Sequence, residues 1–181
     1  MTTPTLPTDL RAIVTAEYPR VKRYMRSKLP EPECYDAAQE AMQAFLAIDP
    51  ARMRNPGAFL MGVARKHVLK YFERHRPSEK FDSTMMSVAQ LGTSMSARLD
   101  RRNLLMHALR SLPVDHQSAF ELRHAEGLSL EEVAEALDVS LATVKRYLES
   151  ARSSLAKTLG TRDGQLAESD AAQLAEAYRR A

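Results

Sequence analysis

Basic and hydroxyl side chains gather between residues 140 and 152, where their types and spacing suit recognition of a polyanion. Val144 and Leu148 fall on one helical stripe, and the polar groups fall outside it. Arginine and lysine donate hydrogen bonds to phosphates and to the acceptor edge of guanine, and hydroxyls serve as shorter partners. We therefore expect nucleic-acid contacts, without bond-making chemistry, from Ser140, Thr143, Lys145, Arg146 and Arg152.

A helix-turn-helix pattern positions these side chains. Ser129 is a good helix N-cap, and Glu132 three residues later completes a capping box. Asp138 interrupts the helical periodicity, and Ser140 can cap a second helix. Such a pair of helices presents the second one to the DNA major groove. An ordinary amphipathic hairpin with a solvated outer face is the alternative; the two caps together with the basic face favour DNA binding.

A second basic helix is predicted from about Ala58 to Arg76. It follows the turn signature at Asn55, and Pro56 suits a first helical position. Cations beside aromatic rings can hold phosphates and stack unpaired bases, although a solvated charged face over a core stripe is the commoner use of such a helix. The residues concerned are the aromatic Phe59, Tyr71 and Phe72 and the basic Arg65, Lys66, Lys70 and Arg74.

The composition of the 181 residues indicates an all-α protein that interacts with a polyanion. The chain is 44% hydrophobic and 27% charged, has six glycines, and is rich in residues that favour helix. A formal net charge of +3 suits a nucleic-acid partner without proving one. No apolar run approaches the roughly 20 residues of a membrane span. The first residues also lack the pattern of a secretion signal, so we expect a cytoplasmic protein without membrane insertion.

Enzyme and metal chemistry are poorly supported. Cys34 is the one cysteine, which excludes a disulfide framework, and no histidine lies near it to make a nucleophile pair. His107, His116 and His124 are nine and eight residues apart, which does not place them on one helical turn as a zinc pair would need. No glycine-rich phosphate loop occurs. We expect no catalytic residue, no metal and no cofactor.

The pattern along the chain predicts two small helical domains joined by a flexible linker, with the helix-turn-helix in the second. Within the first domain, helices are expected from Asp9 to Leu29, with a kink or break at Pro19, and from Tyr35 to Ile48. The predicted limits are a disordered N-terminus at 1–8, a first domain at 9–77, a linker at 78–96, a second domain at 97–159 and a C-terminal extension at 160–181, either a weak helix or a loose tail.

Three stretches resemble the extracytoplasmic-function group of RNA polymerase sigma factors, in the sigma-70 family. Asp36–Phe45 resembles the helix that binds the polymerase clamp, and Arg54–Arg65 resembles the turn and helix that handle the minus-10 promoter element. Leu112–Pro113, followed by Phe120–Ser129 and then Val139–Lys145, resembles the domain that binds the minus-35 element. The family's fold is helical, and the resemblance implies that the two predicted domains are its regions 2 and 4, without the intermediate domain of larger sigma factors.

The resemblance also implies a division of labour among residues. Core RNA polymerase would be bound through Asp36, Gln39, Glu40 and Met42, and promoter DNA near the minus-10 element through Asn55, Phe59, Arg65, Lys66, Lys70 and Arg74. The outward face of the helix-turn-helix would read the minus-35 element. The family often has Phe where Met42 stands, Trp at Phe59, and Asn and Asp at Lys66 and Lys70, which puts the promoter sequence in doubt and leaves the role intact. An anti-sigma factor is a further implied partner.

The predicted function is therefore that of an alternative sigma factor, a non-catalytic specificity subunit of RNA polymerase. A stand-alone helix-turn-helix transcriptional regulator is the main alternative, with the first domain serving dimerisation or ligand sensing. That alternative leaves the basic, aromatic helix after Asn55 without a task. A purely protein-binding helical scaffold is the third, and it would have no need for a capped basic helix.

Overall fold

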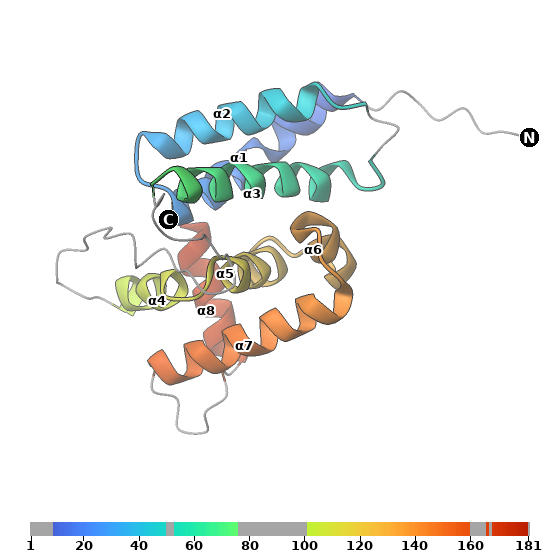
Figure 1. Ribbon diagram of the computed structural model, residues 1–181. Helices are drawn as coiled ribbons and strands as arrows, with labels where there is room; N and C mark the ends of the chain where they lie inside the picture. The colour runs from blue at the N-terminus through green and yellow to red at the C-terminus, as the bar shows by residue number, and fades with distance from the viewer. Residues whose placement is uncertain (1–8, 50–52, 76–100, 160–165, 167, 181) are drawn as a thin grey trace, which may run out of the picture.

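The structure is a computed structural model, which describes residues 9–49, 53–75, 101–159, 166 and 168–180. These residues form helices and the turns between them, without a strand, as the sequence predicted (Figure 1). The helices are α1 (Leu10–Lys28), α2 (Glu33–Leu46), α3 (Pro56–His75), α4 (Arg101–Arg110), α5 (Val114–Phe120), the π-helical turn η3 (Glu121–Ala125), α6 (Leu130–Leu137), α7 (Leu141–Leu159) and α8 (Glu168–Arg179).

Helices α1, α2 and α3 pack on one another and form what we call the N-terminal module. Asp9 begins α1, because its carboxylate accepts hydrogen bonds from the backbone N–H groups of Arg11 and Ala12. Tyr24, Phe45 and Phe72 are the largest buried aromatic side chains of this module. Helix α1 continues through Pro19, so the predicted break does not occur; a single proline removes one backbone donor, and the packed turns on either side hold the helix together.

Helices α4 to α8 form the C-terminal module, in which α6 and α7 are the predicted helix-turn-helix. The Ser129 hydroxyl accepts a hydrogen bond from the Glu132 N–H, and the Glu132 carboxylate accepts one from the Ser129 N–H. The capping box is thus confirmed. Asp138 then adopts a left-handed conformation with φ 56°, which ends α6 and turns the chain into α7.

The C-terminal extension contributes a packed helix instead of a loose tail. Leu174 and Tyr178 of α8 are almost completely buried, against a cluster that includes Leu109 and Phe120. Near the end of α8, Arg179 donates a hydrogen bond to the backbone carbonyl of Ala125 at 2.9 Å. Helix α8 therefore completes the apolar core of the C-terminal module, behind α4 and α5 in Figure 1.

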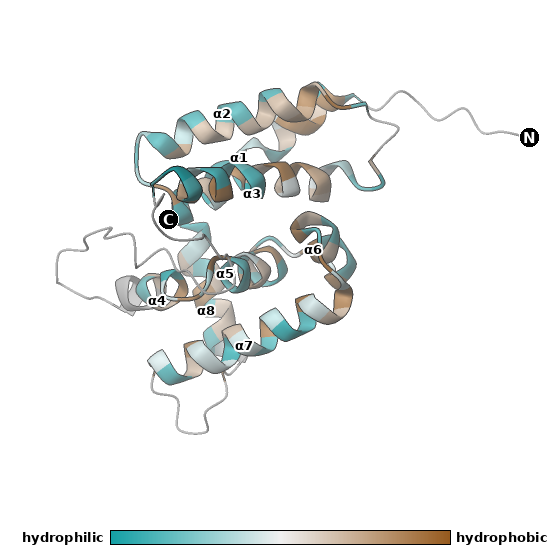
Figure 2. Ribbon diagram, in the orientation of Figure 1, coloured by the Kyte–Doolittle hydropathy of each residue, from teal (hydrophilic) through white to brown (hydrophobic). Residues whose placement is uncertain are grey.

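The two modules pack directly against each other. One continuous hydrophobic cluster includes Tyr24 and Leu60 of the N-terminal module and Leu122 and Val133 of the C-terminal module. Figure 2 shows apolar residues in both α3 and α6 where these two helices lie next to each other. The sequence analysis predicted two separate modules on a tether and did not predict this contact. The predicted linker at 78–96 and the predicted disorder at 1–8 lie outside the described residues.

No helix in the described ranges is long and apolar enough to cross a lipid bilayer. The same ranges contain no cluster of three or more His, Cys, Asp or Glu side chains that could hold a metal ion.

Replacing Leu174 by Ala tests whether α8 is part of the core. The change leaves a cavity beneath α8, and we expect the free energy of unfolding to fall by about 2–5 kcal/mol, as for other buried leucines. The exposed Ser169 of the same helix is the control, since S169A should change stability by no more than about 0.5 kcal/mol. Urea unfolding measures both. An unchanged midpoint for L174A would contradict the packing of α8.

Candidate nucleic-acid interface

Helix α7 presents a cationic outer face. Lys145, Arg146 and Arg152 are exposed, while Val144 and Leu148 of the same helix are buried, as the periodicity predicted. Arg152 also lies over η3, with its Nη2 3.5 Å from His124 Nε2. The structure therefore brings the three predicted cations together on one accessible helix, where they can meet phosphates or base edges.

Ser140 and Thr143 form the N-terminal cap of α7. The Ser140 Oγ accepts a hydrogen bond from the Thr143 N–H at 3.2 Å and lies 2.9 Å from the Thr143 hydroxyl. Their first role is thus to start the helix that carries the cations. Behind α7, His116 packs on the Tyr147 ring with centroids 4.8 Å apart, and burial lowers the pKa of His116. Burial therefore disfavours a positive charge on His116 beneath this face.

Helix α3 carries a second cationic face, formed by the exposed Lys66, Lys70 and Arg74. Arg65, predicted to belong with them, turns the other way. Its Nη2 lies 2.7 Å from the Asp115 Oδ1 of α5, and its Nε donates to the same oxygen at 3.0 Å. Three of the four predicted cations of α3 therefore remain free of this contact between the modules, and Arg65 is held by it.

Asn55 and Phe59 lie where the two modules meet. The Asn55 side-chain oxygen accepts a hydrogen bond from the Ala58 N–H and caps α3, while its Nδ2 donates to the Glu132 carboxylate of α6 at 2.5 Å. Hydrogen bonds from Ser129, and then the one from Asn55, lower the pKa of Glu132. The Phe59 ring is half-buried, with its centroid 6.5 Å from that of Phe45.

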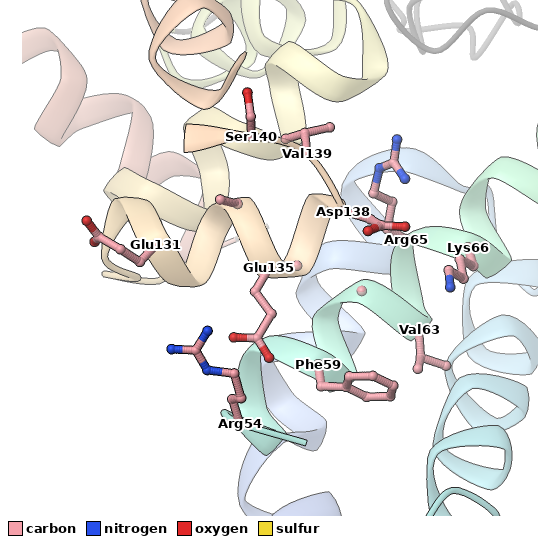
Figure 3. Close-up of a pocket in the computed structure, with 13 residues that line it drawn as sticks. Arg54, Phe59, Val63, Arg65, Lys66, Glu131, Glu135, Asp138, Val139 and Ser140 are labelled. Carbon is pink, nitrogen blue, oxygen red and sulfur yellow. The ribbon is translucent and has the colours of Figure 1, made fainter. Parts of the chain in front are cut away.

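A groove runs between α3 and α6 at this contact (Figure 3). Phe59, Val63 and Lys66 line its α3 side, and Glu135 points into it from α6. The surface predicted to handle the minus-10 element is therefore partly covered by the helix-turn-helix of the same chain.

The residues predicted to bind polymerase lie on α2. Asp36, Gln39 and Glu40 are exposed, and Glu40 also lies 3.2 Å from the His67 ring of α3. Met42 is only 6% exposed and packs in the core of the N-terminal module. The first three side chains are accessible to a partner, and in this conformation Met42 supports the helix from beneath.

The polar contacts between the modules were missed by the sequence analysis. Lys28 is fully buried and pairs with the equally buried Glu121, while Arg20 and Arg23 both pair with Glu126. The Tyr24 hydroxyl lies 2.8 Å from the Ser118 hydroxyl. One signal existed: Lys28 follows Val21 and Tyr24 at helical spacing, which places a charge on the apolar stripe of α1.

Comparison with known families accounts for both modules. The family model described as Sigma-70 region 2 matches residues 13–77, and the one described as Sigma-70, region 4 matches residues 102–155. The chain belongs to the sigma-70 family. The two matches cover the N-terminal module and the helix-turn-helix, in that order.

Two relatives from Escherichia coli are similar over most of this chain. The ECF RNA polymerase sigma-E factor of Escherichia coli K12 is 28% identical over 151 residues, which are 75% of this chain and 76% of that protein. The ferric citrate uptake sigma factor FecI of the same strain is 28% identical over 140 residues, which are 72% of this chain and 79% of FecI. These similarities place the chain in the extracytoplasmic-function group of the family.

Two further similarities are more limited. The RNA polymerase sigma-E factor of Streptomyces antibioticus is 38% identical over 90 residues, so this chain spans about half the length of that relative. Among solved structures, the sigma factor RpoE of Bartonella quintana, crystallised with the anti-sigma factor NepR, has a TM-score of 0.63 over 86% of this chain and 99% of that one. At 18% identity this likeness concerns the fold alone.

Breaking the buried Lys28–Glu121 pair tests the contact between the modules. We expect K28M to lower the free energy of unfolding by about 3–5 kcal/mol, because it leaves the Glu121 carboxylate buried without its cation. Adding E121Q removes that charge and keeps the hydrogen bonds to Ser27 and Gln117, so the double variant should recover most of the loss. Urea unfolding of the wild type, K28M and the double variant measures the free energy of unfolding. A double variant no more stable than K28M would contradict the pairing.

Proposed function

We propose that this chain is an alternative sigma factor, which binds core RNA polymerase and directs promoter recognition, DNA melting and transcription initiation. The observation that carries the proposal is the order of the two family matches, together with an exposed cationic face on each matched part, on α3 and on α7. A protein with two such faces can contact two separate stretches of one promoter, and tethering makes the second contact effectively intramolecular.

Helix α2 is the proposed polymerase contact, with Asp36, Gln39 and Glu40 as its exposed polar groups. Met42 would contribute through the core that holds α2 in place. We assign residues 9–77 to region 2 and 97–159 to region 4, and we take 160–181 as an extension that adds α8. The chain itself would perform no catalysis, since the polymerase makes the RNA, and it would act in the cytoplasm.

Helix α3 is the proposed contact with the melted minus-10 element. Strand opening needs a pocket for an extruded base and cations for the exposed backbone. Asn55 and Phe59 at the start of α3 would take the base, and the cations Arg65, Lys66, Lys70 and Arg74 would hold the strand. The exposure of the last three supports this assignment.

Helix α7 is the proposed contact with the minus-35 element. Its N-terminal cap at Ser140 and Thr143 fixes the start of the helix, and Lys145, Arg146 and Arg152 project from its outer face. In helix-turn-helix proteins this helix lies in the major groove, where such side chains reach base edges and phosphates.

An anti-sigma factor is a further proposed partner. The related RpoE fold was crystallised with one, and a helical chain with two DNA-binding faces offers such a partner much surface to cover. The stand-alone regulator remains the alternative outcome. It would bind promoter duplex tightly by itself at physiological salt, whereas a sigma factor should do so only together with core polymerase.

Replacing Lys145 and Arg146 by Ala tests the role of α7. We expect promoter-specific transcription with core polymerase to fall at least tenfold, because each lost contact to a base or phosphate weakens recognition by about 1–3 kcal/mol. Co-sedimentation with core polymerase should not change. Lys157 is exposed on the same helix, and K157A is the matched control. Equal loss of polymerase binding in K145A/R146A would contradict the division of labour.

Replacing Asp36 and Gln39 by Ala tests the role of α2. Both side chains are exposed, so the fold should be unaffected, while affinity for core polymerase should drop at least tenfold if they are central contacts. The exposed Glu73 of α3 provides the control variant E73A. Competition with a labelled wild-type chain for core polymerase gives the affinities. Undiminished competition by D36A/Q39A would place the polymerase contact elsewhere.

A further inference from the structure

The outer face of α7 contains an acid among its cations. Glu149 is exposed, and it lies one helical turn after Lys145 and one turn before Arg152. All three side chains border the same hollow of about 710 Å³, together with Arg123. Helix α7 lies at the end of the molecule opposite α2, so this face is accessible in the free chain (Figure 1). The proposed function uses the cations and leaves Glu149 without a role.

Glu149 does not pair with the cations beside it. In the part of the chain that the structure describes, its carboxylate forms no ion pair with Lys145 or Arg152. A lysine four residues before a glutamate is also the less favourable order for such a pair, because that order opposes the helix dipole. The carboxylate is therefore available to a partner outside the chain.

The position of Glu149 on α7 directs it toward base edges. At about 100° per residue, Glu149 lies between Lys145 and Arg146 around the helix axis, on the side away from the buried Val144. When such a helix lies in the major groove, side chains at the centre of its outer face meet the bases, and cations on both sides can reach the phosphates. The flanking cations would thus hold the carboxylate against the bases.

A carboxylate in the major groove is restricted in what it can contact. Phosphates repel it, and so do the acceptor atoms that guanine and thymine expose there. Hydrogen-bond donors in the groove come from the amino groups of cytosine and adenine. In adenine the acceptor N7 lies beside the amino group and repels a carboxylate, whereas in cytosine the amino group has a carbon–hydrogen group beside it. Cytosine is therefore the base that suits Glu149 best.

We propose that Glu149 is a specificity-determining residue of the minus-35 interface, which selects a cytosine by accepting a hydrogen bond from its N4 amino group. The proposal rests on the proposed function and deepens it, since it names the base that one residue of α7 reads. Lys145, Arg146 and Arg152 attract DNA, and the charge of Glu149 opposes that attraction unless a cytosine lies opposite the carboxylate.

A base contact and a structural role have different consequences at position 149. Without the carboxylate, the hydrogen bond to cytosine is lost, and the repulsion of the other bases is lost with it. Transcription from the cytosine promoter should therefore fall relative to promoters with another base at the same position. A defect in the structure of α7 would lower transcription from all of these promoters alike.

The test measures base preference with core polymerase and the full chain. A promoter is first identified by sequencing the transcripts that wild type makes from fragmented genomic DNA, and its minus-35 region is then randomised in a barcoded library. We expect wild type to prefer cytosine at one position, on one strand, about tenfold or more over each other base. For E149A this preference should fall to about twofold or less, with the preferences at other positions unchanged.

Two further variants make the result specific to the carboxylate. Glutamine can hydrogen-bond both N6 and N7 of adenine, so E149Q should shift the preference at the same position from cytosine to adenine. E73Q makes the same chemical change at an exposed residue of α3 and should keep the wild-type preferences in the minus-35 region. Because Glu149 is exposed, its variants should fold, and circular dichroism checks this.

The outcomes separate this proposal from the proposed function. Promoter-specific transcription by wild type without a cytosine preference that depends on Glu149 overturns the role of Glu149 and leaves the sigma factor in place. Equal loss of transcription from every library member by folded E149A and E149Q overturns it too, because a single base contact cannot have that effect. If wild type directs no promoter-specific transcription, the proposed function itself fails.

Discussion

The pairing of cations on α1 and α3 with carboxylates on α5, on η3 and in the turn after η3 is the interaction on which the arrangement of this molecule depends. Lys28–Glu121 is fully buried, Arg65–Asp115 is nearly so, and Glu126 binds both Arg20 and Arg23. Around these pairs, one apolar cluster runs from α1 through α3 to α6. A buried charge left without its partner is costly, so the pairs select one docking geometry over others that would bury the same apolar area.

That geometry separates the three proposed binding faces. Helices α2 and α7 lie at opposite ends of the molecule, while α3 lies between them and packs on α6 (Figure 1). Helix α8 packs behind these pairs. Its Tyr178 is buried, and burial, together with the nearby charges of Glu121 and Glu126, raises the pKa of Tyr178 well above the usual value. The extension thus strengthens the module that closes over α3, and its end reaches α1.

Local features of the fold could be predicted from the sequence, and contacts between distant segments could not. Ser129, Glu132 and Pro56 mark the starts of helices through contacts with residues close by in the sequence, so these helix starts could be predicted. The outward position of the α7 cations follows from helical periodicity alone. Asp115 and Arg65 are fifty residues apart, and neither residue shows its partner locally. Pro19 predicted a kink or a break, and the break does not occur because α1 residues before and after it pack against the core. The site was therefore predicted as a set of residues, and its partial burial was not.

The distance between the modules in solution tests the central claim most directly. Double electron–electron resonance measures this distance between two spin labels, one at the exposed Gln43 of α2 and one at the exposed Ser153 of α7. The buried Cys34 is replaced by Ala so that only these two positions are labelled. For the free chain, the docked arrangement predicts one narrow distance distribution, which lengthens when core polymerase and promoter DNA are added. A broad distribution in the free chain, unchanged by those partners, would contradict the account.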